Sequence, residues 1–215
     1  MGTEVETVYI VDDDPAVREA LSCLLRAIGK NVRLFSSGAD FLNFERDDAP
    51  ACLILDLQMP GLNGLAIQRS VAATIPIIFI SGRGDVESTV KAMKSGASDF
   101  LTKPVDAALL LPAVERALYQ HRIARLDARR HADLLARFRS LTPREQEVLP
   151  FLVKGSLNKQ IGAELGITEY TVQIHRGNIM RKMKADSFAA LVRMTEMLKP
   201  ESAPTASREA MGERN

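Results

Sequence analysis

The sequence lacks the features that mark exported, membrane-embedded or disulfide-linked proteins. None of its apolar runs approaches the roughly 20 residues that a membrane-spanning helix needs, and its first residues are acidic and carry no signal-peptide core. Only two of the 215 residues are cysteines, Cys23 and Cys52, and neither has metal-ligand neighbours. We therefore expect both to be packing residues, and the chain to remain in the cytoplasm without a membrane partner.

A net charge near zero conceals an asymmetry along the chain. Residues 1–120 carry 11 Lys and Arg against 16 Asp and Glu, whereas residues 121–199 carry 15 against 8. The length suits two domains of about 100 to 150 residues each. An acidic first domain suits a cation or phosphate site, and a basic second domain suits nucleic acid.

Short apolar segments alternate with helical patterns over residues 5–122. The predicted strands are 7–11, 31–35, 52–55, 75–80 and 99–101. Strands that alternate with helices predict an α/β fold, a five-stranded doubly wound parallel sheet of the flavodoxin-like class with helices on both faces. The loops at the carboxyl ends of such strands meet at one edge of the sheet, where ligands bind.

Asp56 ends one of these apolar strands abruptly and is followed by turn residues. Taken alone, an aspartate at a strand end is as readily a loop cap as a functional group. However, the polar residues Asp12, Asp13, Ser81 and Lys103 follow other strands of the same set. Because these strand ends meet at one edge, the sequence predicts a cluster of carboxylates with a hydroxyl and an amine beside it.

Such a cluster supports phosphoryl chemistry. Converging carboxylates raise one another's pKa unless a cation offsets them. Oxygen ligands with room for water suit Mg²⁺, or Mn²⁺ in its place, and Lys103 would add a second positive charge. An ionised Asp56 could then attack the phosphorus of a phosphodonor and form an acyl phosphate, to which Ser81 could donate a hydrogen bond.

The first half resembles the receiver domain of bacterial two-component response regulators, over residues 5–122. The resemblance lies in Asp12-Asp13, Asp56 with Met59-Pro60-Gly61, Ser81-Gly82, Phe100 and Lys103-Pro104. It implies that a cognate sensor histidine kinase phosphorylates Asp56 and that the domain has self-phosphorylation and autodephosphorylation chemistry only, so the protein is not an enzyme with turnover. It also implies that Asp13, Asp56 and the Gln58 carbonyl bind Mg²⁺, with Asp12 supporting the site through water.

The same resemblance implies which residues respond to phosphorylation of Asp56. Ser81 would move towards the phosphoryl group, and Phe100 would follow inward, although a phenylalanine at such a place is by itself more often core packing. A cis peptide bond is expected before Pro104.

Residues 106–138 are compatible with a helix throughout, and the part 123–138 contains neither Gly nor Pro. We expect a helical linker at 123–138, with a bend near Pro112, because an interior proline costs about 3 kcal/mol. The apolar repeat is too irregular to choose between a dimerising coiled coil and a strut.

The second half contains explicit helix starts and stops. Thr142, Pro143 and Glu145 form a capping-box pattern, and two further helices, 158–165 and 169–183, flank a turn at Gly166. Helix, glycine turn and helix predict a helix-turn-helix, although a small bundle with a solvated basic face would show the same pattern. Pro150 should kink or shorten its helix, and Gly162 should weaken its own by up to about 1 kcal/mol.

Residues 139–200 resemble the LuxR-type (NarL-like) helix-turn-helix domain, which after a receiver is similar to the FixJ branch of response regulators. The matching segments are 141–149, 158–161, 165–168, 171–172 and 175–183. The resemblance implies DNA contacts from Asn158, Lys159, Thr168, Thr171, Gln173, Ile174, Arg176, Gly177 and Lys182. Some relatives carry a basic residue where this chain has Gly177, so direct readout there is in doubt.

The sequence therefore predicts a transcription factor whose phosphorylated homodimer binds double-stranded promoter DNA, with RNA polymerase as a further partner. One alternative is a phosphate-independent or RNA-binding regulator. Another is a phosphatase with an aspartyl nucleophile, which normally has a second Asp where this chain has Gln58. Residues 201–215 are polar and expected to be disordered.

Overall fold

The structure is a computed structural model that describes residues 5–61, 63–82 and 86–198, so the predicted disorder of 201–215 lies outside the described residues. The chain divides into two compact units, 1–126 and 127–215, and each is described by itself. Among the described residues no helix is long and apolar enough to cross a membrane.

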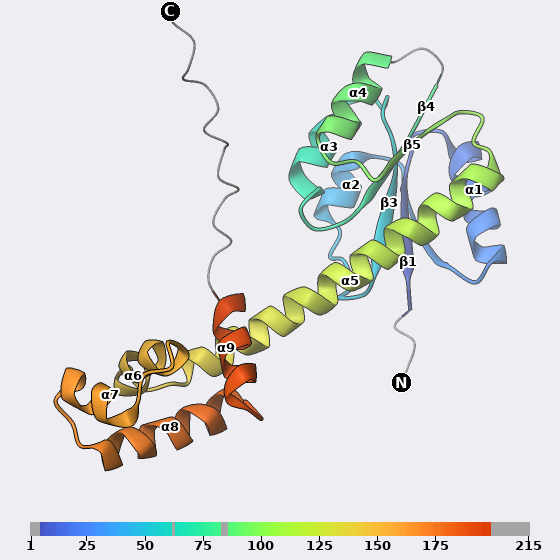
Figure 1. The fold of residues 1–215 in the computed structure, drawn as a ribbon. Helices are drawn as coiled ribbons and strands as arrows, with labels where there is room; N and C mark the ends of the chain where they lie inside the picture. Colours follow the sequence, from blue (N-terminus) through green and yellow to red (C-terminus); the bar gives the residue numbers. More distant parts are fainter. Residues whose placement is uncertain (1–4, 62, 83–85, 199–215) are drawn as a thin grey trace, which may run out of the picture. The chain divides into compact units, whose positions relative to one another are not determined.

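The first unit is built on a five-stranded sheet in the order β2-β1-β3-β4-β5, with every neighbouring pair parallel (Figure 1). This confirms the predicted doubly wound sheet. The strands run over Thr7–Val11, Asn31–Phe35, Ala51–Asp56, Ile77–Ser81 and Asp99–Thr102, numbered β1 to β5.

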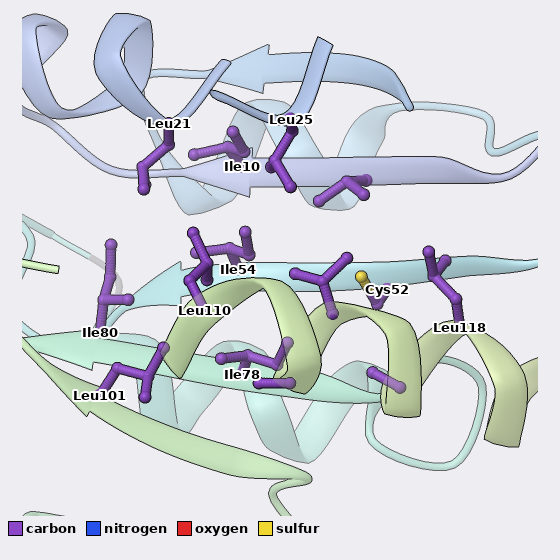
Figure 2. Close-up of a cluster of buried hydrophobic side chains, with 14 of the residues drawn as sticks. Ile10, Leu21, Leu25, Cys52, Ile54, Ile78, Ile80, Leu101, Leu110 and Leu118 are labelled. Atoms are coloured by element: carbon purple, nitrogen blue, oxygen red, sulfur yellow. The ribbon is translucent and has the colours of Figure 1, made fainter. Parts of the chain in front are cut away.

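Helices cover both faces of this sheet because its central strands alternate between two apolar clusters. Ile10, Ile54 and Ile78 pack with α1 and α5 (Figure 2), whereas Tyr9 and Phe79 point to the face covered by α2, α3 and α4. The helix bounds are Pro15–Ala27, Gly38–Asn43, Gly64–Val71, Val86–Lys94 and Ala107–Arg139 for α1 to α5.

A close backbone approach fixes the loop that follows β3. A Cβ atom on Gly64 would lie 2.7 Å from the carbonyl oxygen of Asp56 and 2.9 Å from the ring of Phe79. Only glycine fits there without displacement, and the backbone N–H of Gly64 donates to the Leu57 carbonyl. The start of α3 is thereby held against the end of the strand that carries Asp56.

The second unit contains four short helices around one core. They are α6 (Pro143–Val153), α7 (Asn158–Leu165), α8 (Glu169–Met183) and α9 (Phe188–Met197). Val148, Ile161, Val172 and Ile179 are fully buried between them. The fourth helix was absent from the sequence prediction, although Ser187 caps it by accepting the N–H of Ala190.

Both interior prolines lie in helices that continue past them. Pro112 is inside α5 and Pro150 is inside α6, which extends to Val153. Of the two outcomes expected for Pro150, a kinked or a shortened helix, the shortened helix is therefore wrong. Burial of Val148, Leu149 and Leu152 on either side of it compensates for the lost backbone hydrogen bond.

The turn between α7 and α8 explains Gly162. The Ile167 N–H donates to the Gly162 carbonyl at 2.9 Å, and a Cβ on Gly162 would lie 2.6 Å from the Ile167 oxygen. Gly166 completes the turn with a left-handed φ of 66°. Gly162 thus admits the close turn that lets α8 pack on α7.

We predict that Gly162→Ala destabilises the second unit. Alanine gains up to about 1 kcal/mol of helix propensity, but overpacking costs about 1–3 kcal/mol, so we expect a net loss of about 1–2 kcal/mol. Gly177→Ala is the matched control, since Gly177 is also helical but has open space around its Cβ position. Faster hydrogen exchange of α7 and α8 amides in the first variant and slower exchange in the second would verify this. Equal effects in both variants would contradict it.

Candidate functional site

Three carboxylates meet at the carboxyl edge of the sheet. Asp12 and Asp13 directly follow β1, Asp56 is the last residue of β3, and one oxygen from each lies within 4.8 Å of the others. Asp12 is 0% exposed and Asp56 4% exposed, whereas Asp13 faces solvent. The parallel topology therefore gathers residues that are far apart in the sequence.

Lys103 supplies the counter-charge for this cluster. Its Nζ lies 2.7 Å from Asp12 Oδ2 and 2.7 Å from Asp56 Oδ2. Burial lowers the pKa of Lys103, but the hydrogen bonds to both carboxylates outweigh that effect and raise it, so the amine is protonated. Burial also raises the pKa of Asp12, and the bonds from Lys103 and the Asp14 N–H offset only part of this rise.

Loop amides orient the remaining carboxylate oxygens. The Asp14 N–H donates to Asp12 Oδ1 at 2.9 Å, and the Gln58 N–H donates to Asp56 Oδ1 at 3.0 Å. Arg18, which the sequence did not single out, donates to the Asp12 carbonyl at 2.6 Å. Each buried carboxylate thus uses one oxygen for a loop and the other for Lys103.

Ser81 lies at the same edge, at the end of β4. Its carbonyl accepts the Lys103 N–H at 2.7 Å, and the Lys103-Pro104 peptide bond is cis, as expected. The Ser81 side chain is fully buried, and its Oγ has no hydrogen-bond partner among the described residues. Phe100 is half-buried on β5, paired with Phe79 in register.

The donor set fits a hard divalent cation such as Mg²⁺. All three members of the cluster are aspartates, and Asp13 is open to the water that Mg²⁺ retains. Gln58, whose carbonyl was predicted as a ligand, lies two residues after Asp56 in an exposed position.

Helix α8 presents an exposed face in the second unit. Gln173, Ile174 and Gly177 are exposed, with Ile174 at 47%, while Val172 and Ile179 are buried beneath them. Tyr170 is 73% exposed one turn before Ile174. The sequence analysis missed Tyr170, although its spacing of four from Ile174 places it on the same side of the helix.

The remaining predicted contacts surround this face. Thr168 caps α8 by accepting the Thr171 N–H at 3.1 Å, and the two hydroxyls lie 2.9 Å apart. Arg176 stacks over the Phe188 ring at 5.5 Å. It lines a groove of about 470 Å³ together with Asn158 and Lys159. Asn158 Oδ1 is buried in the structure without a hydrogen-bond partner, and Lys159 is exposed.

Comparison with known proteins assigns both units. Residues 8–115 match the family of the response regulator receiver domain, and residues 139–195 match the bacterial regulatory proteins of the luxR family. The response regulator protein TodT of Pseudomonas putida is 50% identical over 202 residues, which cover 93% of this chain and 89% of TodT. This chain belongs to the response regulator family.

Other members support the same assignment. The transcriptional regulatory protein FixJ of Rhizobium meliloti is 41% identical over 191 residues, which cover 87% of this response regulator and 94% of FixJ. The solved structure of the response regulator StyR aligns with a TM-score of 0.83 at 44% identity, covering 89% of this chain and 98% of StyR. The protein is thus a two-component response regulator with a receiver domain and a DNA-binding helix-turn-helix domain, and it acts in transcription regulation.

One predicted DNA contact of this response regulator is engaged within the domain. Lys182 Nζ lies 2.7 Å from Glu145 Oε2, and Glu145 is 3% exposed. The other role of Glu145 is the capping box, in which Oε2 also accepts the Thr142 N–H at 2.8 Å. Lys182 therefore neutralises a buried carboxylate, which differs from the expected contact to a DNA phosphate.

We predict that Glu145→Gln destabilises the DNA-binding domain at neutral pH by about 1–3 kcal/mol, because it leaves Lys182 without its charged partner. Burial raises the pKa of Glu145, but the bonds from Lys182 and Thr142 outweigh it, so the pKa is lower than in the unfolded chain. Glu145 therefore contributes stability above its unfolded pKa of about 4.3 and loses it as the pH falls through the folded value.

The measurement is chemical unfolding of wild type and variant from pH 7 to acid, followed by the helical signal of the domain. Glu147→Gln is the matched control, since Glu147 is half exposed and pairs with Arg144 at the surface. We expect the difference in unfolding free energy between the wild type and Glu145→Gln to shrink as the pH falls. The same difference for Glu147→Gln should stay near zero at every pH. A difference independent of pH would contradict the role of the ion pair.

Proposed function

We propose that a sensor histidine kinase switches this response regulator by phosphorylating Asp56. The observation that carries the proposal is the double contact of Lys103, whose Nζ lies 2.7 Å from both Asp12 and Asp56. The positive charge of that amine offsets the negative charge of the nearly buried Asp56 carboxylate, which is the proposed nucleophile.

The phosphorylation step follows from this arrangement. An oxygen of Asp56 attacks the phosphorus of the phosphodonor, a P–O bond forms, and the bond to the leaving group breaks with its electron pair. Lys103 lies beside the developing charge, and Asp12 holds Lys103 in place. Mg²⁺, held by Asp13, Asp56 and the Gln58 carbonyl, would neutralise charge on the phosphoryl oxygens. Hydrolysis of the acyl phosphate resets the domain, so the chain is a phosphoacceptor rather than an enzyme with an external substrate.

The proposed switch begins at Ser81. Its buried and unpartnered Oγ is ready to donate a hydrogen bond to a phosphoryl group on Asp56. Ser81 pairs with Thr102, and its carbonyl accepts the Lys103 N–H, so a shift of β4 acts on the strand that carries Phe100. To move the equilibrium between the inactive and the active form of the receiver from 1:99 to 99:1, phosphorylation must stabilise the active form by about 5.5 kcal/mol relative to the inactive one. Several charge-assisted hydrogen bonds can supply this free energy.

The proposed output is dimerisation on promoter DNA in the cytoplasm, where RNA polymerase is the further partner. Gln173, Ile174 and Gly177 would face the major groove with Tyr170 beside them, while Lys159 would contact a phosphate. Their exposure on and near α8 supports this assignment. We propose the receiver as 5–122, the linker as 123–138 and the helix-turn-helix domain as 139–200.

We predict that acetyl phosphate with Mg²⁺ increases self-association and promoter affinity of the wild type. Asp56→Asn should remain at the basal level because it has no nucleophilic oxygen anion. Ser81→Ala should still incorporate phosphate but lose most of the gain in affinity. Sedimentation velocity and binding to genomic promoter fragments measure both properties.

The exposed Ser70 of α3 offers a matched control, and Ser70→Ala should behave as the wild type. Equal self-association and equal DNA affinity before and after treatment of the wild type would rule out the switch. Preference for RNA competitor over promoter DNA would support the RNA-binding alternative instead.

A second prediction distinguishes the roles of two lysines of the DNA-binding domain, Lys159 and Lys182. Lys159→Met should weaken binding to all DNA sequences and lower the slope of log K against log salt by about 0.9, as expected for one lost phosphate contact. Lys182→Met should lower the stability of the domain but leave this slope unchanged, since Lys182 is bonded to Glu145. A reduced slope for Lys182→Met would return Lys182 to the set of phosphate contacts.

A further inference from the structure

A small polar pocket lies at the edge of the receiver sheet opposite the carboxylate cluster. Its volume is about 120 Å³, and its walls include Tyr9 of β1, Arg46 and Asp47 of the segment before β3, and His121 and Arg125 of α5. None of these residues takes part in the proposed phosphorylation site.

Three buried polar atoms around this pocket have no hydrogen-bond partner among the described residues. They are Tyr9 Oη, Arg46 Nη1 and Arg125 Nε, and Tyr9 is only 1% exposed. More than about 90% of buried polar atoms in proteins are paired. Three exceptions around one cavity therefore indicate that the cavity holds a molecule that completes their hydrogen bonds.

The pocket offers mainly donors. The two arginine nitrogens can only donate, and the Tyr9 hydroxyl can donate as well. His121 Nδ1 accepts the Ala51 N–H at 2.8 Å, so its single proton lies on Nε2. Burial lowers the pKa of His121, and the neighbouring Arg125 adds to this effect, which keeps the ring neutral.

The charges around the pocket also favour an acceptor ligand. Arg125 forms an ion pair with Asp48 at 2.6 Å, whereas the recorded partner of Arg46 is the Phe41 ring at 5.6 Å. Asp47 is the acidic residue on the wall, and it is exposed to solvent. Among the described residues no carboxylate lies within ion-pair distance of Arg46, so its guanidinium is available to an acceptor in the pocket.

We propose that this pocket binds a small oxyanion, either a short-chain carboxylate or inorganic phosphate. A volume of about 120 Å³ corresponds to about four water molecules at ~30 Å³ each, which admits acetate, propionate or phosphate but no larger metabolite. A bound oxyanion would accept hydrogen bonds from Tyr9, Arg46 and Arg125. It would thereby join the segment before β3 to α5, the helix that leads out of the receiver domain.

The test is a titration of the full-length protein with sodium acetate, propionate or phosphate at constant ionic strength maintained with sodium chloride. NMR shifts of the backbone amides of residues 46–51 and of the His121 ring report occupancy. We expect saturable shifts with at least one oxyanion and none with chloride alone. Tyr9→Phe should weaken binding by about fivefold through loss of one hydrogen bond, and Arg46→Gln should abolish it.

Arg69→Gln, which removes an exposed arginine of α3, should bind as the wild type does. A response to carboxylates alone or to phosphate alone would identify which oxyanion the pocket takes. The proposal is overturned if none of these anions produces saturable shifts, which would mean that the pocket holds water only. Unchanged affinity in both Tyr9→Phe and Arg46→Gln would overturn it equally. Because Tyr9→Phe retains the aromatic ring, loss of folding does not obscure its result.

Discussion

Two carboxylates with almost no access to water repel each other when they lie side by side, unless a cation between them offsets their charge. In this protein the cation is the Lys103 ammonium, which contacts Asp12 and Asp56 at the same distance of 2.7 Å. The sheet topology makes the contact possible, because parallel strands bring β1, β3 and β5 to a common edge. Gly64, the loop amides of Asp14 and Gln58, and the Ser81 carbonyl then hold the participants in place.

The DNA-binding domain also pairs a buried carboxylate with a lysine, but with a different consequence. Glu145 is as deeply buried as Asp56, and Lys182 neutralises it at 2.7 Å. Here, however, the other hydrogen bond of the carboxylate goes to a helix cap, so the pair contributes to the stability of the domain. At the Asp56 site an exposed aspartate and an unpartnered hydroxyl accompany the ion pair. These additional groups distinguish the proposed phosphoacceptor from a carboxylate that serves the fold alone.

Much of the fold and of the candidate site was predictable from the sequence, because the strands, helices and turns that form them are marked by local patterns. The alternation around Ile10 and Ile54 and the turn residues after Asp56 predicted the sheet and the carboxylates at its edge. The helices 158–165 and 169–183 were predicted at the bounds that the structure gives to α7 and α8. Helix α9 was missed although its cap at Ser187 is local, whereas the roles of Gly162 and Lys182 depend on contacts that exist only in the folded domain. Gly162 has a weak helix propensity, and the need for it appears only when Ile167 is placed beside it.

Lys182 illustrates the same limit for charged residues. A lysine near the end of a basic helix predicts a phosphate contact. Only the folded domain reveals that this lysine donates a hydrogen bond to a buried carboxylate 37 residues earlier. For Ser81, which the sequence placed in the cluster, the structure adds that its hydroxyl is buried with no hydrogen-bond partner among the described residues, and this supports the proposed switch.

The most direct test of the central claim is to locate the acyl phosphate. The wild-type protein would be phosphorylated with acetyl phosphate and Mg²⁺, reduced with borohydride, which converts an acyl-phosphorylated aspartate to homoserine, and mapped by peptide mass spectrometry. Homoserine at position 56, and at no other aspartate, is the predicted result. Modification at Asp12 or Asp13, or none at all under conditions where the protein is folded, would contradict it.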